Sequence, residues 1–314
     1  MRRHSNPFVL RAAALLASGA MLFGVAAWSQ IRREVNLVVI HTTVVDKTGH
    51  FVLDLDETDF EVREDGVKQS LSLFRKEAVP VTVGLVLDNS ASMAHKREKM
   101  MAGALSFVEV FNQDDEFFVV NFNSDYFLDL EGKDFTNSTE DVRTALDRTN
   151  TRGQTAIFDA LRASMNHIRG GTRQKKVLLV ISDGVDNSSY SSFETLYEEA
   201  QKSETSLYFV ILPCSGDDEK RECRRAKREV RKLSAATGGM AYFPQTLNEV
   251  VTLSRQIADD IRSQYVLAYK PANRARDGRF RRVEIKIKKK RGRKKLEARH
   301  RPGYYAKSSH QGSQ

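Results

Sequence analysis

The sequence predicts an α/β protein, in which a doubly wound, mostly parallel sheet is joined to a smaller β-sandwich-like domain built from both chain ends. Two observations predict this fold. Residues 79–263 alternate short apolar runs with helical patterns, which is typical of a parallel sheet covered by helices on both faces. The flanking segments, 30–78 and 264–306, have strand patterns without intervening helices, and the 314 residues suffice for two domains.

The first 29 residues have the pattern of a signal peptide. Three arginines precede an apolar stretch over residues 12–27, and Ala27-Trp28-Ser29 supplies a small-x-small cleavage pattern. An uncleaved membrane anchor is the alternative, although the stretch is shorter than the roughly 20 residues that a spanning helix needs. With either outcome, we expect the rest of the chain to be exported to the periplasm, the cell envelope or the extracellular space.

The segment after this leader reads as a small β unit. Residues 35–45 are rich in β-branched side chains, residues 59–64 alternate in polarity, and residues 69–74 follow a turn at 64–66. A unit of this size buries too little apolar surface to be stable alone. We therefore expect other strands of the chain to complete it.

The central segment begins with an apolar strand at 81–87 and continues with alternating helices and strands. The expected helices cover residues 97–111, 142–148, 157–168, 192–202, 221–235 and 247–263. The expected further strands cover residues 117–122, 177–181, 207–212 and 241–243. In such sheets ligands bind outside the carboxyl ends of the strands, so the polar residues that follow these strands are candidate site residues.

The last segment returns to strand character. Residues 265–269 form one expected strand, and residues 283–287 alternate apolar with charged side chains, which gives one dry face. A basic turn then leads into residues 296–300. We expect these strands to complete the N-terminal β unit and residues 307–314 to form a disordered tail.

The net charge of +9 is distributed unevenly. Residues 279–301 contain thirteen Lys or Arg against two Glu, so the basicity is assigned to this terminal segment and not to the central domain. The basic hairpin at 286–295 has three interpretations: a solvated strand edge, a contact for acidic envelope polymers or lipid head groups, or a nucleic-acid contact. No nucleic acid is expected as a partner, because the segment lacks interleaved aromatic residues and the chain is predicted to be exported.

The two cysteines, Cys214 and Cys223, lie nine positions apart. In an exported protein, an even number of cysteines suggests a local disulfide, and two free thiols in a loop are the alternative. A zinc site is disfavoured, because two cysteines without a nearby pair of histidines leave the ligand set incomplete.

Two carboxylates and three hydroxyls lie in three separate loops at strand ends: Asp88, Ser90, Ser92, Thr155 and Asp183. All five are oxygen donors, and this is the set that a hard divalent cation such as Mg²⁺ prefers. The competing interpretation is that Asp88, Ser90 and Ser92 cap the following helix, because Asp and Ser are favoured at helix N-termini.

The metal-ion-dependent adhesion site (MIDAS) of von Willebrand factor type A domains has a similar pattern: Asp-x-Ser-x-Ser, a distant Thr, and a distant Asp followed by Gly. All five residues match it, within a resemblance that covers roughly residues 79–262. It implies a Rossmann-like domain in which Ser90, Ser92 and Thr155 bind Mg²⁺ directly, with Mn²⁺ or Ca²⁺ as alternatives. The two aspartates would bind the metal directly or through its waters. In that family, an acidic residue of a partner protein completes the coordination.

The flanks resemble a family of exported bacterial proteins, described chiefly in acidobacteria, that carry this domain. The matching segments are residues 60–69, 265–269 and 301–305. This second resemblance extends over nearly the whole mature chain and informs the architecture more than the function.

We therefore expect an exported binding module and not an enzyme, in which the bound cation coordinates an Asp or Glu of a partner protein. A structural envelope-assembly protein, whose metal site only stabilises the fold, is the second hypothesis. A Mg-dependent hydrolase or phosphotransferase is the third. An aspartyl-phosphate enzyme needs a carboxylate two residues after its nucleophile, where this chain has Ser90, and no phosphate-cradling glycine motif occurs.

Overall fold

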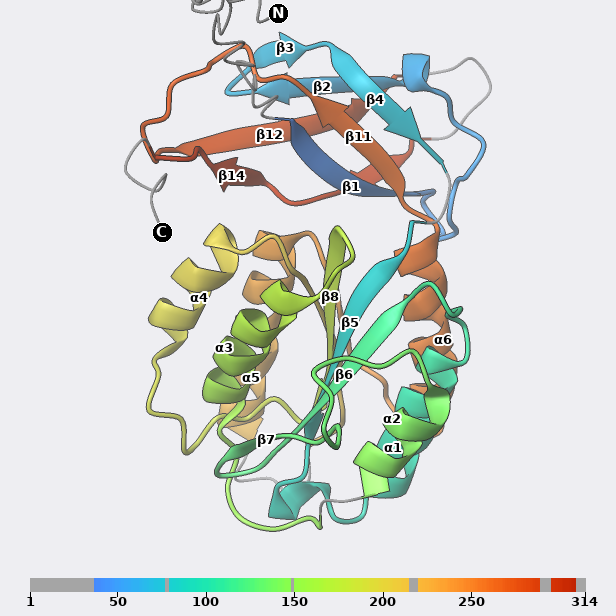
Figure 1. Ribbon diagram of the computed structural model, residues 1–314, viewed down its shortest axis with the longest axis vertical. Helices are drawn as coiled ribbons and strands as arrows, with labels where there is room; N and C mark the ends of the chain where they lie inside the picture. Colours follow the sequence, from blue (N-terminus) through green and yellow to red (C-terminus); the bar gives the residue numbers. More distant parts are fainter. Residues whose placement is uncertain (1–36, 77–78, 148–149, 215–219, 289–294, 309–314) are drawn as a thin grey trace, which may run out of the picture. The chain divides into compact units, whose positions relative to one another are not determined.

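The structure is a computed structural model that describes residues 37–76, 79–147, 150–214, 220–288 and 295–308 (Figure 1). The predicted leader lies outside these residues, as do most of the basic hairpin and most of the predicted tail. Among the helices of the described part, none combines the length and the apolarity needed to cross a bilayer.

The α/β part contains a six-stranded sheet. Its order is β10 (Ala241–Tyr242), β9 (Ser206–Ile211), β8 (Lys175–Ser182), β5 (Val81–Asp88), β6 (Glu116–Phe122) and β7 (Tyr126–Leu128). All neighbours are parallel except β6 and β7. Every residue of the central strand β5 is buried, as expected for a parallel strand covered on both faces. The predicted doubly wound sheet is confirmed.

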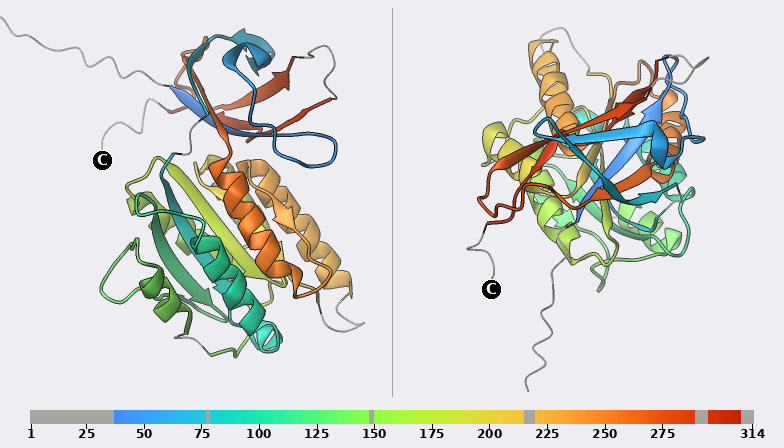
Figure 2. Two further views of the ribbon diagram at one scale, coloured as in Figure 1. Left: turned by 90° about the vertical axis from the view of Figure 1, so that its right-hand side faces the viewer. Right: turned by 90° about the horizontal axis from the view of Figure 1, so that it is seen from above.

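Two groups of helices cover the two faces of this sheet. One face packs against α1 (Arg97–Val108), α2 (Thr139–Asp147) and α6 (Glu249–Arg262), which form the side turned to the viewer in the left panel of Figure 2. The other face packs against α3 (Ile157–His167), α4 (Phe193–Lys202) and α5 (Lys220–Thr237). Short 3₁₀ turns lie at η1 (Glu57–Asp59), η2 (Ala91–Met93) and η3 (Ile168–Gly170).

The chain reverses its direction of winding between β5 and β8. The segment after β5 leads to α1 on one face, and the segment after β8 leads to α4 on the other. Such a switch point leaves a crevice at the carboxyl ends of the two strands. The last paired residues are Leu87 and Ile181, so Asp88 and Ser182 end the two strands at the same level.

The β-rich part is a sandwich of two antiparallel four-stranded sheets. One sheet has the order β13 (Glu297–Arg299), β1 (Val38–Val45), β11 (Tyr265–Tyr269) and β4 (Leu71–Arg75). The other has the order β14 (Gly303–Tyr305), β12 (Phe280–Ile287), β2 (Phe60–Glu64) and β3 (Val67–Gln69). Both sheets contribute to one apolar core, and each contains strands from both chain ends. The predicted flanking domain is therefore confirmed.

The prediction of one strand over residues 69–74 is wrong. β3 ends at Gln69 and β4 begins at Leu71, and the two strands belong to different sheets. Periodicity does not reveal this corner, because it reports which face a side chain takes and not which sheet its strand joins. The short strand β7 is not predicted either, since all three of its residues are exposed and supply no alternation.

Gly84 tests the packing of the central strand. A Cβ atom at this position would lie 2.3 Å from Phe118 Cζ and 2.4 Å from Leu178 Cδ2. We expect Gly84→Ala to lower the free energy of unfolding by about 1–3 kcal/mol, because a close-packed core resists added volume. Gly170→Ala is the matched control, since its nearest neighbour would lie at 3.5 Å. Equal melting temperatures for the two variants would contradict the expectation.

Candidate metal centre

Three loops meet at the carboxyl ends of β5 and β8, and backbone hydrogen bonds join them. Ala91, in the loop after β5, donates to the carbonyl of Gly153 at 3.1 Å. Asn187, in the loop after β8, donates to the carbonyl of Thr155 at 3.0 Å. Gly153 has φ +75°, a left-handed conformation that favours glycine, so this residue type allows the turn beside Ala91.

Asp88 is fully buried at the end of β5. One carboxylate oxygen accepts a hydrogen bond from the backbone N–H of Ser90 at 2.8 Å, and the other accepts from Ser182 Oγ at 2.6 Å. Burial, together with the nearby charge of Asp183, raises the pKa of Asp88 from 3.8 to about 6 despite these hydrogen bonds. The ionised carboxylate is therefore costly in this position.

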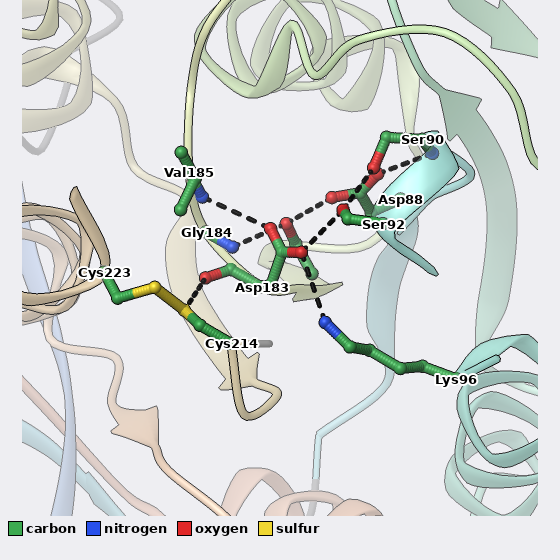
Figure 3. Close-up of polar contacts among 10 residues, drawn as sticks. Asp88, Ser90, Ser92, Lys96, Asp183, Gly184, Val185, Cys214 and Cys223 are labelled. Atoms are coloured by element: carbon green, nitrogen blue, oxygen red, sulfur yellow. Dashed lines mark hydrogen bonds and ion pairs between the residues drawn. A yellow bond between two sulfur atoms is a disulfide. The ribbon is translucent and has the colours of Figure 1, made fainter. Parts of the chain in front are cut away.

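The two serine hydroxyls connect the β5 loop to Asp183, as Figure 3 shows. Ser92 Oγ donates to Asp183 Oδ2 at 2.7 Å, and the hydroxyls of Ser90 and Ser92 lie 3.1 Å apart. Neither side chain caps a helix, because Ser90 precedes η2 without a side-chain cap bond and α1 begins after Lys96. The helix-capping interpretation of these two serines is therefore wrong.

Thr155 is buried and is held by its backbone. Its N–H donates to Asn187 Oδ1 at 2.8 Å, and its carbonyl accepts from the N–H groups of Asn187 and Ser188. In the part of the chain that the structure describes, its hydroxyl makes no hydrogen bond to the other four predicted residues. The structure thus joins Asp88, Ser90, Ser92 and Asp183 through a polar network and brings the Thr155 segment beside them through loop contacts.

A buried lysine belongs to the same network and was not predicted. Lys96 is 1% exposed, and its Nζ lies 3.3 Å from Asp183 Oδ2 (Figure 3). Met93 and Met100 are buried three residues before and four residues after it. This helical spacing is the sequence signal that places Lys96 on an inward face. Its ammonium group offsets one of the two aspartate charges.

Two further carboxylates fix the loop after β8. Asp159 accepts hydrogen bonds from the backbone N–H groups of Tyr190 at 2.7 Å and Ser191 at 3.1 Å. Asp186 accepts from Ser189 Oγ at 2.5 Å, and burial raises the pKa of Asp186. These two carboxylates position the loop that follows Asp183, and their hydrogen bonds are made to that loop.

The two cysteines form a disulfide beside the same loop, as predicted. The Cys214–Cys223 bond joins the segment after β9 to the first turn of α5. Cys214 Sγ lies 4.0 Å from the carbonyl oxygen of Asp183. The disulfide therefore flanks the backbone of one predicted ligand.

The donor chemistry fits a hard divalent cation. Among the described residues, no group of three or more His, Cys, Asp or Glu is arranged to hold a metal. The candidate site instead combines two carboxylates with hydroxyls, which are oxygen donors that suit Mg²⁺, Mn²⁺ or Ca²⁺ better than zinc. The charge of Asp88 lacks a cation of its own, and a divalent ion would supply one.

Comparison with known proteins agrees with this architecture. A family profile described as the von Willebrand factor type A domain matches residues 82–256. A search of curated protein sequences finds no significant match.

The solved structures that are similar to the chain include the following two. A von Willebrand factor type A protein from Catenulispora acidiphila has a TM-score of 0.52 and 12% identity, over 80% of this chain and 73% of that chain. Proximal thread matrix protein 1 from the mussel byssus, with a zinc-occupied MIDAS motif, has a TM-score of 0.51 and 18% identity. This match covers 63% of the present chain and 50% of the mussel chain. At these identities, the similarity concerns the fold alone.

Asp88→Asn should stabilise the metal-free protein at neutral pH while weakening metal binding. The gain is about 1–3 kcal/mol, because one pKa unit corresponds to about 1.4 kcal/mol and the variant has no buried charge at this position. Since the folded-state pKa is raised, the wild type recovers stability as the pH falls from about 6 towards 3.8, and the gap between the two proteins narrows there.

Chemical denaturation of the chelator-treated protein between pH 4 and pH 8 measures this effect. Asp125→Asn is the control, because Asp125 is exposed and its replacement should leave the pH dependence of the stability unchanged. A variant that is less stable than the wild type at pH 7.5 would show instead that the Asp88 carboxylate stabilises the fold.

Lys96→Met should raise the affinity for Mg²⁺, because it removes a buried positive charge that repels the metal. We expect the Kd to fall on the order of tenfold or more, which corresponds to about 1.4 kcal/mol or more of relieved repulsion. The metal-free variant should also melt at a lower temperature, since Asp183 loses its counter-charge. Calorimetric titration checks the affinity and thermal denaturation checks the melting temperature, each against Lys99→Met on the same helix. Weaker Mg²⁺ binding by the Lys96 variant would contradict this role.

Proposed function

Since the chain belongs to the von Willebrand factor type A domain family, which matches residues 82–256, we propose that it is an exported, metal-dependent protein-binding module. A divalent cation at the carboxyl ends of β5 and β8 coordinates an Asp or Glu side chain of a partner protein. The observation that carries this proposal is the balance of charges in the candidate site.

The buried charges favour a carboxylate as the incoming ligand. Asp88 and Asp183 contribute two negative charges, and Lys96 contributes one positive charge. A bound divalent cation leaves one excess positive charge in a largely buried site, and such a charge is costly without a counter-charge. One partner carboxylate neutralises it. Ser92 is exposed at the rim, so a partner can approach from that side.

The proposed ligand set combines hydroxyls with carboxylates. We assign the hydroxyls of Ser90, Ser92 and Thr155 as direct ligands, and Asp88 and Asp183 as direct ligands or holders of metal-bound waters. When bound, the cation supplies a Lewis acid that attracts the carboxylate, while the protein residues orient it. Mg²⁺ is the proposed ion, with Mn²⁺ and Ca²⁺ as alternatives, and zinc belongs in the test because the mussel protein carries it in its MIDAS.

Export is supported by two features of the chain. The first 29 residues have the composition of a signal peptide, and the Cys214–Cys223 disulfide is typical of proteins in oxidising compartments. We propose the periplasm, the cell envelope or the extracellular space as the location. We also propose, from the resemblance of the flanks, that the protein is related to exported acidobacterial proteins.

Ser90→Ala/Ser92→Ala separates a binding role of the metal from a purely structural one. We expect this double variant to lose on the order of tenfold or more in Mg²⁺ and Mn²⁺ affinity, because two proposed ligands are removed. Its metal-free melting temperature should fall by only a few degrees, since the hydrogen bond from Ser92 to Asp183 is lost while Lys96 still pairs with that carboxylate. Calorimetric titration and thermal melting measure the two effects, with the exposed Ser72→Ala as control.

A partner-like carboxylate tests the open coordination position. Bound Mn²⁺ enhances the relaxation of water protons, and acetyl-glutamate amide should reduce this enhancement by displacing a coordinated water. Acetyl-glutamine amide, which is neutral, should leave it unchanged. An equal response to both compounds would contradict carboxylate recognition, and a serine double variant that unfolds without metal would favour the structural hypothesis.

A further inference from the structure

A second charged feature lies on α5. The helix carries eight Lys or Arg against two Glu. All five of its arginines are exposed, and Arg225 pairs with Glu229. The other four lie at spacings of three, four and three residues, on one side of the helix: Arg221, Arg224, Arg228 and Arg231. We refer to these four as the arginine face. Together with the acidic residues 217–219 that precede the helix, the sequence from 217 to 232 still has three excess positive charges.

Among the described residues, few contacts offset the charge of the arginine face. The guanidinium of Arg231 stacks on the ring of Phe243, with its carbon 4.3 Å from the ring centroid. Across the described ranges, Arg221, Arg224 and Arg228 make no ion pair with a carboxylate. Like charges three and four residues apart repel one another on a helix, so a bound anion would relieve repulsion within this face.

The first turns of α5 adjoin the loop of the candidate metal centre. A Cβ atom at Gly184 would lie 3.6 Å from the Cβ of Ala226, so the two backbones approach closely. Cys223 is joined to Cys214, whose sulfur contacts the carbonyl of Asp183 (Figure 3). The arginine face therefore lies on the outer side of the helical turns that touch this loop.

The sequence-based assignment of basicity to residues 279–301 alone is thus incomplete. Glutamates on the neighbouring helix α4 and aspartates elsewhere cancel the α5 charges in any sum over the central domain. In three dimensions the α4 glutamates Glu194 and Glu198 lie beside Lys232 of α5, whereas the residues of the arginine face are exposed.

We propose that the metal and the arginine face bind one ligand, an acidic segment of a partner protein. One carboxylate of the segment coordinates the metal, and later carboxylates pair with the arginines. This inference rests on the proposed function, since the metal contact is the first anchor. Guanidinium groups suit it because their planar donors hold carboxylates with two parallel hydrogen bonds.

The dimensions set the length of the segment. A helix is about 10 Å across with its side chains, and an extended peptide spans about 3.3 Å per residue. About three to five residues therefore separate the metal-bound carboxylate from the first carboxylate at the arginine face. The single excess charge of the metal-loaded site fits one carboxylate, whereas a phosphate polymer carries a higher charge density.

Octaglutamate and triglutamate peptides test this inference, because only the longer peptide reaches both anchors. In Mg²⁺, Arg224→Gln/Arg228→Gln should weaken octaglutamate binding on the order of tenfold or more, since each lost charged hydrogen bond is costly. Triglutamate binding and Mg²⁺ affinity should stay unchanged. The control is Arg169→Gln/Arg274→Gln, which removes the same charge from exposed positions elsewhere. Isothermal titration at low ionic strength measures the binding of both peptides to the wild type and to the two double variants.

The outcomes separate this inference from the proposed function. If chelation abolishes octaglutamate binding but the arginine variant binds normally, the inference is overturned and the metal contact stands. If binding survives chelation and fails only in the arginine variant, the metal contact is refuted. Tighter binding of polyphosphate than of octaglutamate, retained without metal, would identify a phosphate polymer as the occupant and overturn the acidic-protein assignment.

Discussion

The candidate site depends on the parallel pairing of β5 with β8 at the centre of the sheet. Seven consecutive residue pairs, from Val81 with Lys175 to Leu87 with Ile181, fix the register of the two strands. The residues that follow both strands therefore emerge at the same level. Because α1 and α4 leave towards opposite faces, the strand ends stay open, and Asp88 and Asp183 come close enough for their charges to interact.

This geometry carries an energetic cost that the metal-free protein only partly offsets. Asp88 is buried and accepts hydrogen bonds, but no positively charged side chain among the described residues pairs with it. The raised pKa of Asp88 reflects the cost of burying its charge. Lys96 compensates Asp183 at 3.3 Å and leaves Asp88 uncompensated. A fold under selection for stability alone would place apolar residues here, since they pack without desolvation cost. The three buried charges are consistent with the proposed binding of a cation followed by a carboxylate.

Sequence alone predicted most of the fold, because the fold depends on local signals, and it selected five candidate residues whose segments the structure brings to one edge of the sheet. Apolar runs and helical periods locate the buried strands, and the aspartates stand out because carboxylates rarely end such strands without a reason. Lys96 and Ser182 were missed, since their importance arises from neighbours across the sheet and not along the chain. The corner between β3 and β4 was missed because a change of sheet leaves the pattern of alternation intact.

The same topology places the arginine face beside the candidate metal centre. Helices that follow parallel strands begin at the carboxyl edge of the sheet, so their partially positive N-terminal ends gather there. α5 carries Arg221 and Arg224 in its first turns, although positive side chains are disfavoured near a helix N-terminus. The Cys214–Cys223 disulfide holds this turn beside the Asp183 loop. Departures from such local sequence preferences are expected at functional sites. An acidic partner segment would relieve both the repulsion among the arginines and the unfavourable placement of positive charge at the helix N-terminus.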